Sequence, residues 1–109
     1  MTDKIVVLTT CAAEADAERM ARSLVAGRLA ACVTVVPGAR SFYHWKGGIE
    51  SAGEFLLIVK TSRDLFAALQ EEMEKLHPYE VPELIALPVV AGAENYLSWL
   101  ESNLRGARE

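Results

Sequence analysis

The densest group of chemically capable side chains lies at residues 77–83, where the chain reads His-Pro-Tyr-Glu-Val-Pro-Glu. A histidine beside carboxylates can transfer protons or bind a metal ion, and a phenol can donate a hydrogen bond. Pro78 and Pro82 restrict the backbone and can hold such groups in place. A solvated connection between a helix and a strand also explains these residues, and spacing alone leaves both interpretations open.

The other histidine and the two cysteines form no recognisable site by spacing. His44 lies in an aromatic stretch, where an interface or surface role is commoner than ligation. Cys11 and Cys32 match neither a CxxC redox pair nor a zinc-binding repeat, so we expect free thiols, buried as small hydrophobic groups. The sequence also lacks a nucleophile elbow, a phosphate-binding loop and an HExxH helix. A metal site therefore needs residues that folding or a neighbouring subunit brings together.

The strands that must position these groups are marked by apolar runs rich in β-branched residues. Such runs lie at 5–8, 32–36 and 55–59, and a proline-bearing fourth run lies at 82–90. Because proline cannot donate to a sheet ladder, the fourth strand belongs at an edge. The first and third runs are continuously apolar, which is typical of strands covered on both faces, so we place them at the centre of the sheet.

Apolar residues at helical spacing predict two helices between the strands and a short one at the end. The first two span residues 12–26 and 61–76, and the last follows Gly92. We expect Gly27 to end the first helix and Thr61 or Ser62 to cap the second. The order is βαββαβ plus a C-terminal helix, a split βαβ motif. We predict a single α+β domain over residues 1–109, folded as a ferredoxin-like sandwich.

An aromatic segment connects the second and third strands. Phe42, Tyr43 and Trp45 lie just before a turn at 46–49. Successive residues of a strand face opposite sides, so both sides of this hairpin carry large aromatic rings. Exposed aromatic patches usually mark interfaces, although the terminal helix could cover one side within the same chain. We predict that Tyr43 and Trp45 contact another subunit.

Charge and composition exclude several classes of protein. The 109 residues carry a formal net charge of −4 and no basic run, which argues against nucleic-acid binding. No apolar stretch approaches the ~20 residues of a membrane span, and the N-terminal run is too short for a signal peptide. We therefore expect a cytoplasmic protein without membrane or nucleic-acid partners. The hydrophobic fraction of 51% suggests additional burial between subunits.

Six segments form a recognisable series along the chain. They are residues 28–33 (RLAACV), 36–38 (VPG), 43–47 (YHWKG), 59–61 (VKT), 77–83 (HPYEVPE) and 96–100 (YLSWL). Together they resemble the CutA family of divalent-cation tolerance proteins over essentially the whole chain. The resemblance implies a tight homotrimer of ferredoxin-like subunits, similar to the PII nitrogen-regulatory proteins, and a role in tolerance to copper and other divalent metal ions. It implies no established reaction, so we do not expect an enzyme.

The resemblance carries over the family's metal ligands only in part. Some members present a cysteine near the end of the first strand and two adjacent histidines before the proline. Here those positions hold Thr9 and the pair Leu76-His77. His77 is therefore the predicted metal ligand, and we expect copper or another divalent cation to bind weakly. Further candidates at the family's ligand cleft are Cys32, Lys60, Tyr79 and Glu83.

Three functions are compatible with these residues. The leading one is a trimeric metal-binding or metal-responsive tolerance protein. The second is a regulatory or scaffolding trimer that binds a small ligand or a protein partner at the subunit cleft. The third is a small enzyme that uses His77 with Glu83 or Lys60 for acid–base chemistry, but spacing provides no activating pair. An RNA-binding module is excluded because the aromatic and basic sheet motif is missing.

Overall fold

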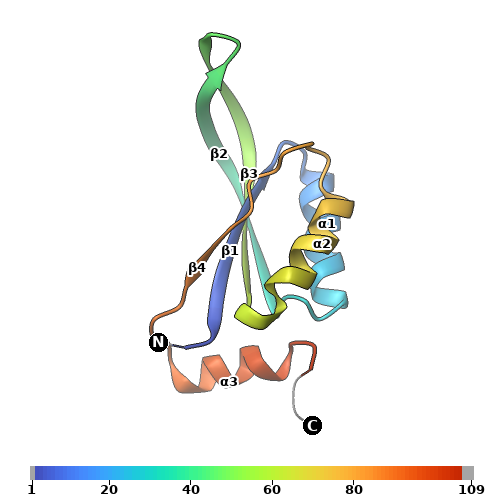
Figure 1. Cartoon of the computed structure of the whole chain (residues 1–109), viewed down its shortest axis with the longest axis vertical. Coiled ribbons are helices and arrows are strands. Elements are labelled where there is room, and N and C mark those ends of the chain that lie inside the picture. Colours follow the sequence, from blue (N-terminus) through green and yellow to red (C-terminus); the bar gives the residue numbers. More distant parts are fainter. Residues whose placement is uncertain (1, 107–109) are drawn as a thin grey trace.

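The computed structural model describes residues 2–106; residues 1 and 107–109 of the predicted domain lie outside the described part. The elements are β1 (Lys4–Cys11), α1 (Glu14–Ala26), β2 (Cys32–Trp45), β3 (Gly48–Ser62), the 3-10 turn η1 (Arg63–Leu65), α2 (Phe66–Leu76), β4 (Ile85–Pro88) and α3 (Glu94–Ser102). This order confirms the predicted ferredoxin-like arrangement with a terminal helix (Figure 1).

The four strands form one antiparallel sheet in the order β2-β3-β1-β4. The continuously apolar β1 and β3 are central, and the proline-bearing β4 is an edge, as predicted. Only Ile85–Pro88 pair with β1, so β4 is shorter than the predicted 82–90. Beyond Pro88, the N–H of Val89 still donates a hydrogen bond of 3.0 Å to the carbonyl of Lys4, whereas Pro82 has no N–H to donate.

Strands β2 and β3 continue beyond the sheet as a two-stranded arm, residues 39–54 (Figure 1). The sequence suggested a break at Pro37-Gly38, but β2 runs through it with a shift in register between Val36 and Ala39. Gly38 has φ +83°, a left-handed conformation that glycine adopts easily, so a bulge replaces the break. Positive φ angles at Lys46 and Gly47 then close the arm, as in tight hairpin turns.

Helices α1 and α2 lie on one face of the sheet and form the core with it (Figure 1). Odd-numbered residues of β1 and β3 point to this face, because side chains alternate along a strand. The fully buried side chains of this core include Val7, Leu57 and Val59 from the strands and Met20, Leu24, Leu69 and Met73 from the helices.

The end of α1 agrees with the sequence prediction, and the start of α2 does not. Gly27 closes α1 with φ −82°, and Arg28 takes the left-handed conformation at φ 57°. Thr61 does not cap α2, because β3 extends to Ser62 and keeps Thr61 within the sheet. Its Oγ1 instead donates a hydrogen bond of 2.7 Å to the carbonyl of Leu29, which fixes the loop after α1.

Thr9 places a hydroxyl in the core that has no hydrogen-bond partner among residues 2–106. A buried polar group without a partner costs about 1–3 kcal/mol. Thr9→Val keeps the branched shape, so we expect it to raise the free energy of unfolding by about 1 kcal/mol, measured by urea denaturation. Thr61→Val is the matched control: it is equally buried but loses a hydrogen bond, so it should destabilise. A destabilised Thr9→Val would contradict this account.

Within residues 2–106, no layer of helices covers the opposite face of the sheet, apart from α3 at one end. We call this face the open face; its apolar residues are Val6, Leu8, Val36, Leu56, Ile58, Ile85 and Leu87. Ile85 is 50% exposed and Leu87 is 48% exposed. Among the described residues, no helix is long and apolar enough to cross a membrane.

Helix α3 crosses the end of the sheet that lies farthest from the arm (Figure 1). Leu100 and Leu104 pack there against Ala31. The ammonium group of Lys4 ties β1 to α3, because it lies 2.7 Å from carboxylate oxygens of both Asp3 and Glu101. The terminal helix therefore does not cover the aromatic arm. Cover by this helix within the same chain, the alternative to an interface between subunits, is thereby excluded.

Candidate functional site

The predicted site residues fall into two groups at opposite ends of the sheet. Cys32 lies directly opposite Lys60 on the open face near α3. The ammonium of Lys60 lies 3.3 Å from the hydroxyl of Tyr96 and 5.7 Å from the centre of its ring. His77 and Tyr79 instead lie beside the base of the arm, near Glu54. Positions 54 and 60 are six residues apart along β3, which is about 20 Å, so one chain does not bring the two groups together.

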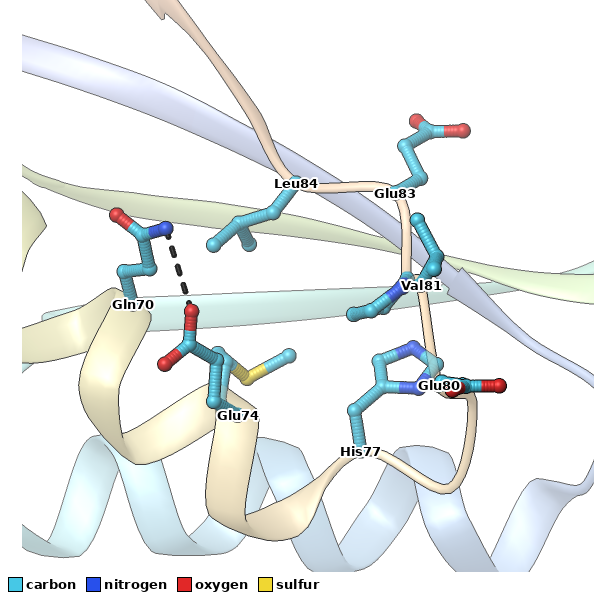
Figure 2. Close-up of a pocket in the computed structure, with 9 residues that line it drawn as sticks. Gln70, Glu74, His77, Glu80, Val81, Glu83 and Leu84 are labelled. Carbon is cyan, nitrogen blue, oxygen red and sulfur yellow. Dashed lines mark hydrogen bonds between the residues drawn. The ribbon is translucent and has the colours of Figure 1, made fainter.

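Both ring nitrogens of His77 take part in hydrogen bonds. The side chain is only 7% exposed at the end of α2, beside the loop that carries Glu80 (Figure 2). The N–H of Tyr79 donates to Nδ1 at 3.1 Å, so Nε2 carries the proton and donates to the carbonyl of Thr10 at 2.8 Å. A metal ion can bind His77 only if one of these hydrogen bonds is broken.

The side chains of one chain do not fit a high-affinity metal centre. Within residues 2–106, no three His, Cys, Asp or Glu residues are grouped closely enough to hold an ion. Cys11 is fully buried on the helix-covered face, and burial raises the pKa of its thiol, which disfavours the metal-binding thiolate. Cys32 lies on the other face of the sheet. Both cysteines are free thiols, as predicted.

A cavity of about 360 Å³ lies between α2 and the loop that follows it (Figure 2). Gln70, Glu74, His77 and Glu83 line it, and Gln70 donates a hydrogen bond of 3.4 Å to the Glu74 carboxylate. Figure 2 shows the Glu83 side chain directed away from Gln70 and Glu74. The carboxylates around this cavity therefore do not converge on one point.

A buried carboxylate at the base of the arm is the most organised polar feature of the chain. Glu54 is 8% exposed and accepts hydrogen bonds from the hydroxyls of Ser41 at 2.7 Å and Tyr79 at 2.8 Å. Burial, together with the neighbouring Glu54 carboxylate, raises the pKa of Tyr79 to about 12. The phenol therefore keeps its proton at neutral pH and acts as a donor.

Sequence reasoning identified Tyr79 but missed Glu54 and Ser41. An acidic residue in front of an apolar strand and a serine among aromatic residues are both ordinary surface patterns. The bulge after Val36 fixes the register that places Ser41 near Glu54. The one available signal was that two prolines hold the Tyr79 segment rigid, which does not identify its partner.

The strand order and the extended arm define a small ferredoxin-like α+β domain with an open sheet face. A comparison with protein families gives a more specific result: residues 5–103 match the family described as CutA1 divalent ion tolerance protein. The chain belongs to this family, as its sequence motifs predicted.

Individual relatives agree with this assignment. The chain is 48% identical over 98 residues to the divalent-cation tolerance protein CutA of Thermus thermophilus, covering 90% of this chain and 95% of that one. It is 44% identical over 105 residues to the CutA protein of Pectobacterium atrosepticum, covering 96% of each. The crystal structure of CutA from Xylella fastidiosa superimposes with a TM-score of 0.92 at 41% identity, over 94% of this chain and 99% of that one.

Proposed function

We propose that the protein acts in divalent-cation tolerance as a homotrimer assembled through the open face. The observation that carries the assembly is the uncovered central sheet, where Leu8 and Ile58 lie side by side in an apolar surface. Soluble monomers rarely expose an apolar surface of this kind. The arm supports the same conclusion, since Tyr43 is 43% exposed and Trp45 is 58% exposed in the single chain. We propose that both contact a neighbouring subunit.

We propose further that the protein is not an enzyme and that it binds copper or another divalent cation weakly, with His77 as the ligand. One imidazole is a poor site by itself, because soft divalent ions prefer several nitrogen or sulfur donors. His77 must also give up a hydrogen bond to Thr10 or Tyr79 before it can bind. The tolerance role therefore does not require tight chelation by this chain.

Calorimetric titration of the assembled protein with Cu²⁺ or Zn²⁺ tests the metal proposal. We expect a dissociation constant in the micromolar range or weaker. This corresponds to a binding free energy of about −8 kcal/mol or smaller in magnitude. His77→Ala should abolish the heat of binding, and His44→Ala, at an exposed position on the arm, should leave it unchanged. A nanomolar site that survives His77→Ala would contradict the proposal.

The second candidate function is a regulatory or scaffolding trimer that binds a small ligand or a protein partner at a subunit cleft. The cavity beside Glu54 and Tyr79 supports it, because a buried and hydrogen-bonded carboxylate there is already held in place. In the titration above, no response to any metal ion would favour this function over direct cation binding.

We propose a cytoplasmic location for the protein. Its two free cysteines support this, because reducing compartments keep thiols unpaired. A related structure from Archaeoglobus fulgidus is described as a periplasmic divalent cation tolerance protein. It is 36% identical to this chain with a TM-score of 0.88, over 92% of this chain and 97% of that one.

A further inference from the structure

Glu54 is a buried charge without a counter-charge in its own chain. Within residues 2–106, no ion pair joins its carboxylate to a basic side chain. Two hydroxyl donors, from Ser41 and Tyr79, occupy one position on each oxygen. A carboxylate has about four acceptor positions, so about two are left. Buried charges in proteins are normally paired, which indicates that a positive group completes this site.

The space in front of Glu54 is shaped to receive such a group. A cavity of about 710 Å³ lies between the arm and the loop after α2, within the size range of small-molecule sites. Its lining includes Tyr43, Tyr79 and Val81 and a second carboxylate, Glu83, and none of its described lining residues is basic. Aromatic faces attract cations, and their rims accept apolar chains. The cavity therefore combines a fixed negative charge with an apolar, cation-attracting wall.

We propose that this cavity binds a small organic cation, whose primary ammonium group contacts the Glu54 carboxylate and whose apolar chain lies along the aromatic wall. An ammonium group has three N–H donors, which can use the free acceptor positions of Glu54. A metal ion fits less well. The cavity is lined by two carboxylates, Glu54 and Glu83, and the Ser41 and Tyr79 hydroxyls already donate to Glu54, so within residues 2–106 it offers fewer than three His, Cys, Asp or Glu ligands. The site rests on the second candidate function above: the proposed trimer brings a neighbouring subunit against Tyr43, so the cavity belongs to the subunit cleft, and it does not use His77.

The test is titration of the assembled protein with n-butylammonium chloride, followed by amide NMR shifts and calorimetry. We expect saturable binding, with the shift changes concentrated at Ser41, Glu54 and Tyr79. The neutral analogue n-butanol and Mg²⁺ should produce no comparable effect. Shift changes confined to other regions of the wild-type protein would overturn the proposal without the need for any variant.

Variants separate charge from shape at the same site. Glu54→Gln should weaken n-butylammonium binding at least about tenfold, because a hydrogen bond to a buried charge is lost. Glu50→Gln is the matched control: Glu50 lies on the same strand, is exposed, and does not line this cavity. Its affinity should be unchanged. Equal affinity of Glu54→Gln and the wild type, with both proteins folded by circular dichroism, would refute the proposal.

A basic side chain of a neighbouring copy is the other possible source of positive charge, and Arg40 and Lys46 lie on the arm. If the wild type does not bind n-butylammonium but Arg40→Gln or Lys46→Gln does, a neighbouring subunit fills the site. That outcome would overturn the small-ligand proposal and assign Glu54 to assembly. If the wild type binds and these two variants do not change the affinity, the small-ligand proposal is supported.

Discussion

Ile58→Glu is expected to convert the assembled protein into single chains. Ile58 lies on the central strand β3, opposite Leu8 on one side and Thr34 on the other, in the middle of the open face. In an assembly that covers this face, the introduced carboxylate would be buried without a partner, at a cost of several kcal/mol for each subunit. The mass measured by light scattering should therefore fall to that of one chain, and the melting temperature should fall with it.

A charge on an exposed apolar residue elsewhere provides the control. Val25 lies on α1 and is 43% exposed, away from the open face. Val25→Glu introduces the same side chain without burying it, so we expect the mass of the assembly to be unchanged. If Ile58→Glu kept the mass of the wild type, the open face would not be the interface, and the assembly proposed here would be wrong.

Tyr79→Phe is expected to lower the free energy of unfolding at pH 7 by about 1.5–3 kcal/mol, the range for hydrogen bonds to charged groups. The variant removes the donor that lies 2.8 Å from the Glu54 carboxylate and leaves the buried charge with Ser41 alone. Urea denaturation measures the effect. Tyr96→Phe, which removes a phenol from a ring that is 42% exposed and lies outside this cavity, should change the stability by less than about 0.5 kcal/mol.

The hydrogen bond from Tyr79 to Glu54 also predicts how the free energy of unfolding responds to alkaline pH. The pKa of Tyr79 is raised from 10.0 to about 12 in the folded protein. The folded state therefore holds this proton more tightly than the unfolded state. The resulting stabilisation is complete below pH 10 and is lost as the pH rises towards 12. The stability difference between wild type and Tyr79→Phe should shrink over this interval; a constant difference would show that the phenol does not depend on Glu54.

The sequence predicted the sheet well because the controlling signals are local. Continuous apolar runs place β1 and β3 at the centre, and the prolines of the last strand place it at an edge. The bulge at Gly38 was read as a break, since Pro-Gly marks a turn in most sequences. β2 is a single strand only because it pairs with β3 both before and after this bulge.

The site was predicted less completely because its contacts join distant parts of the chain. His77 and Tyr79 were recognisable by type and by the prolines beside them. Their partners Thr10 and Glu54 come from other strands, so the register of the sheet decides which residues meet. The same geometry separates Lys60 from His77 within one chain, so the cleft that the family resemblance implies needs residues from two subunits.

The mass of the wild-type protein in solution tests the central claim most directly. In the proposed trimer, other copies of the chain cover the open face and contact Tyr43 and Trp45 of the aromatic arm. Light scattering coupled to size-exclusion chromatography, at micromolar concentration and at neutral pH, should return the mass of three chains. The mass of a single chain under these conditions would contradict the account.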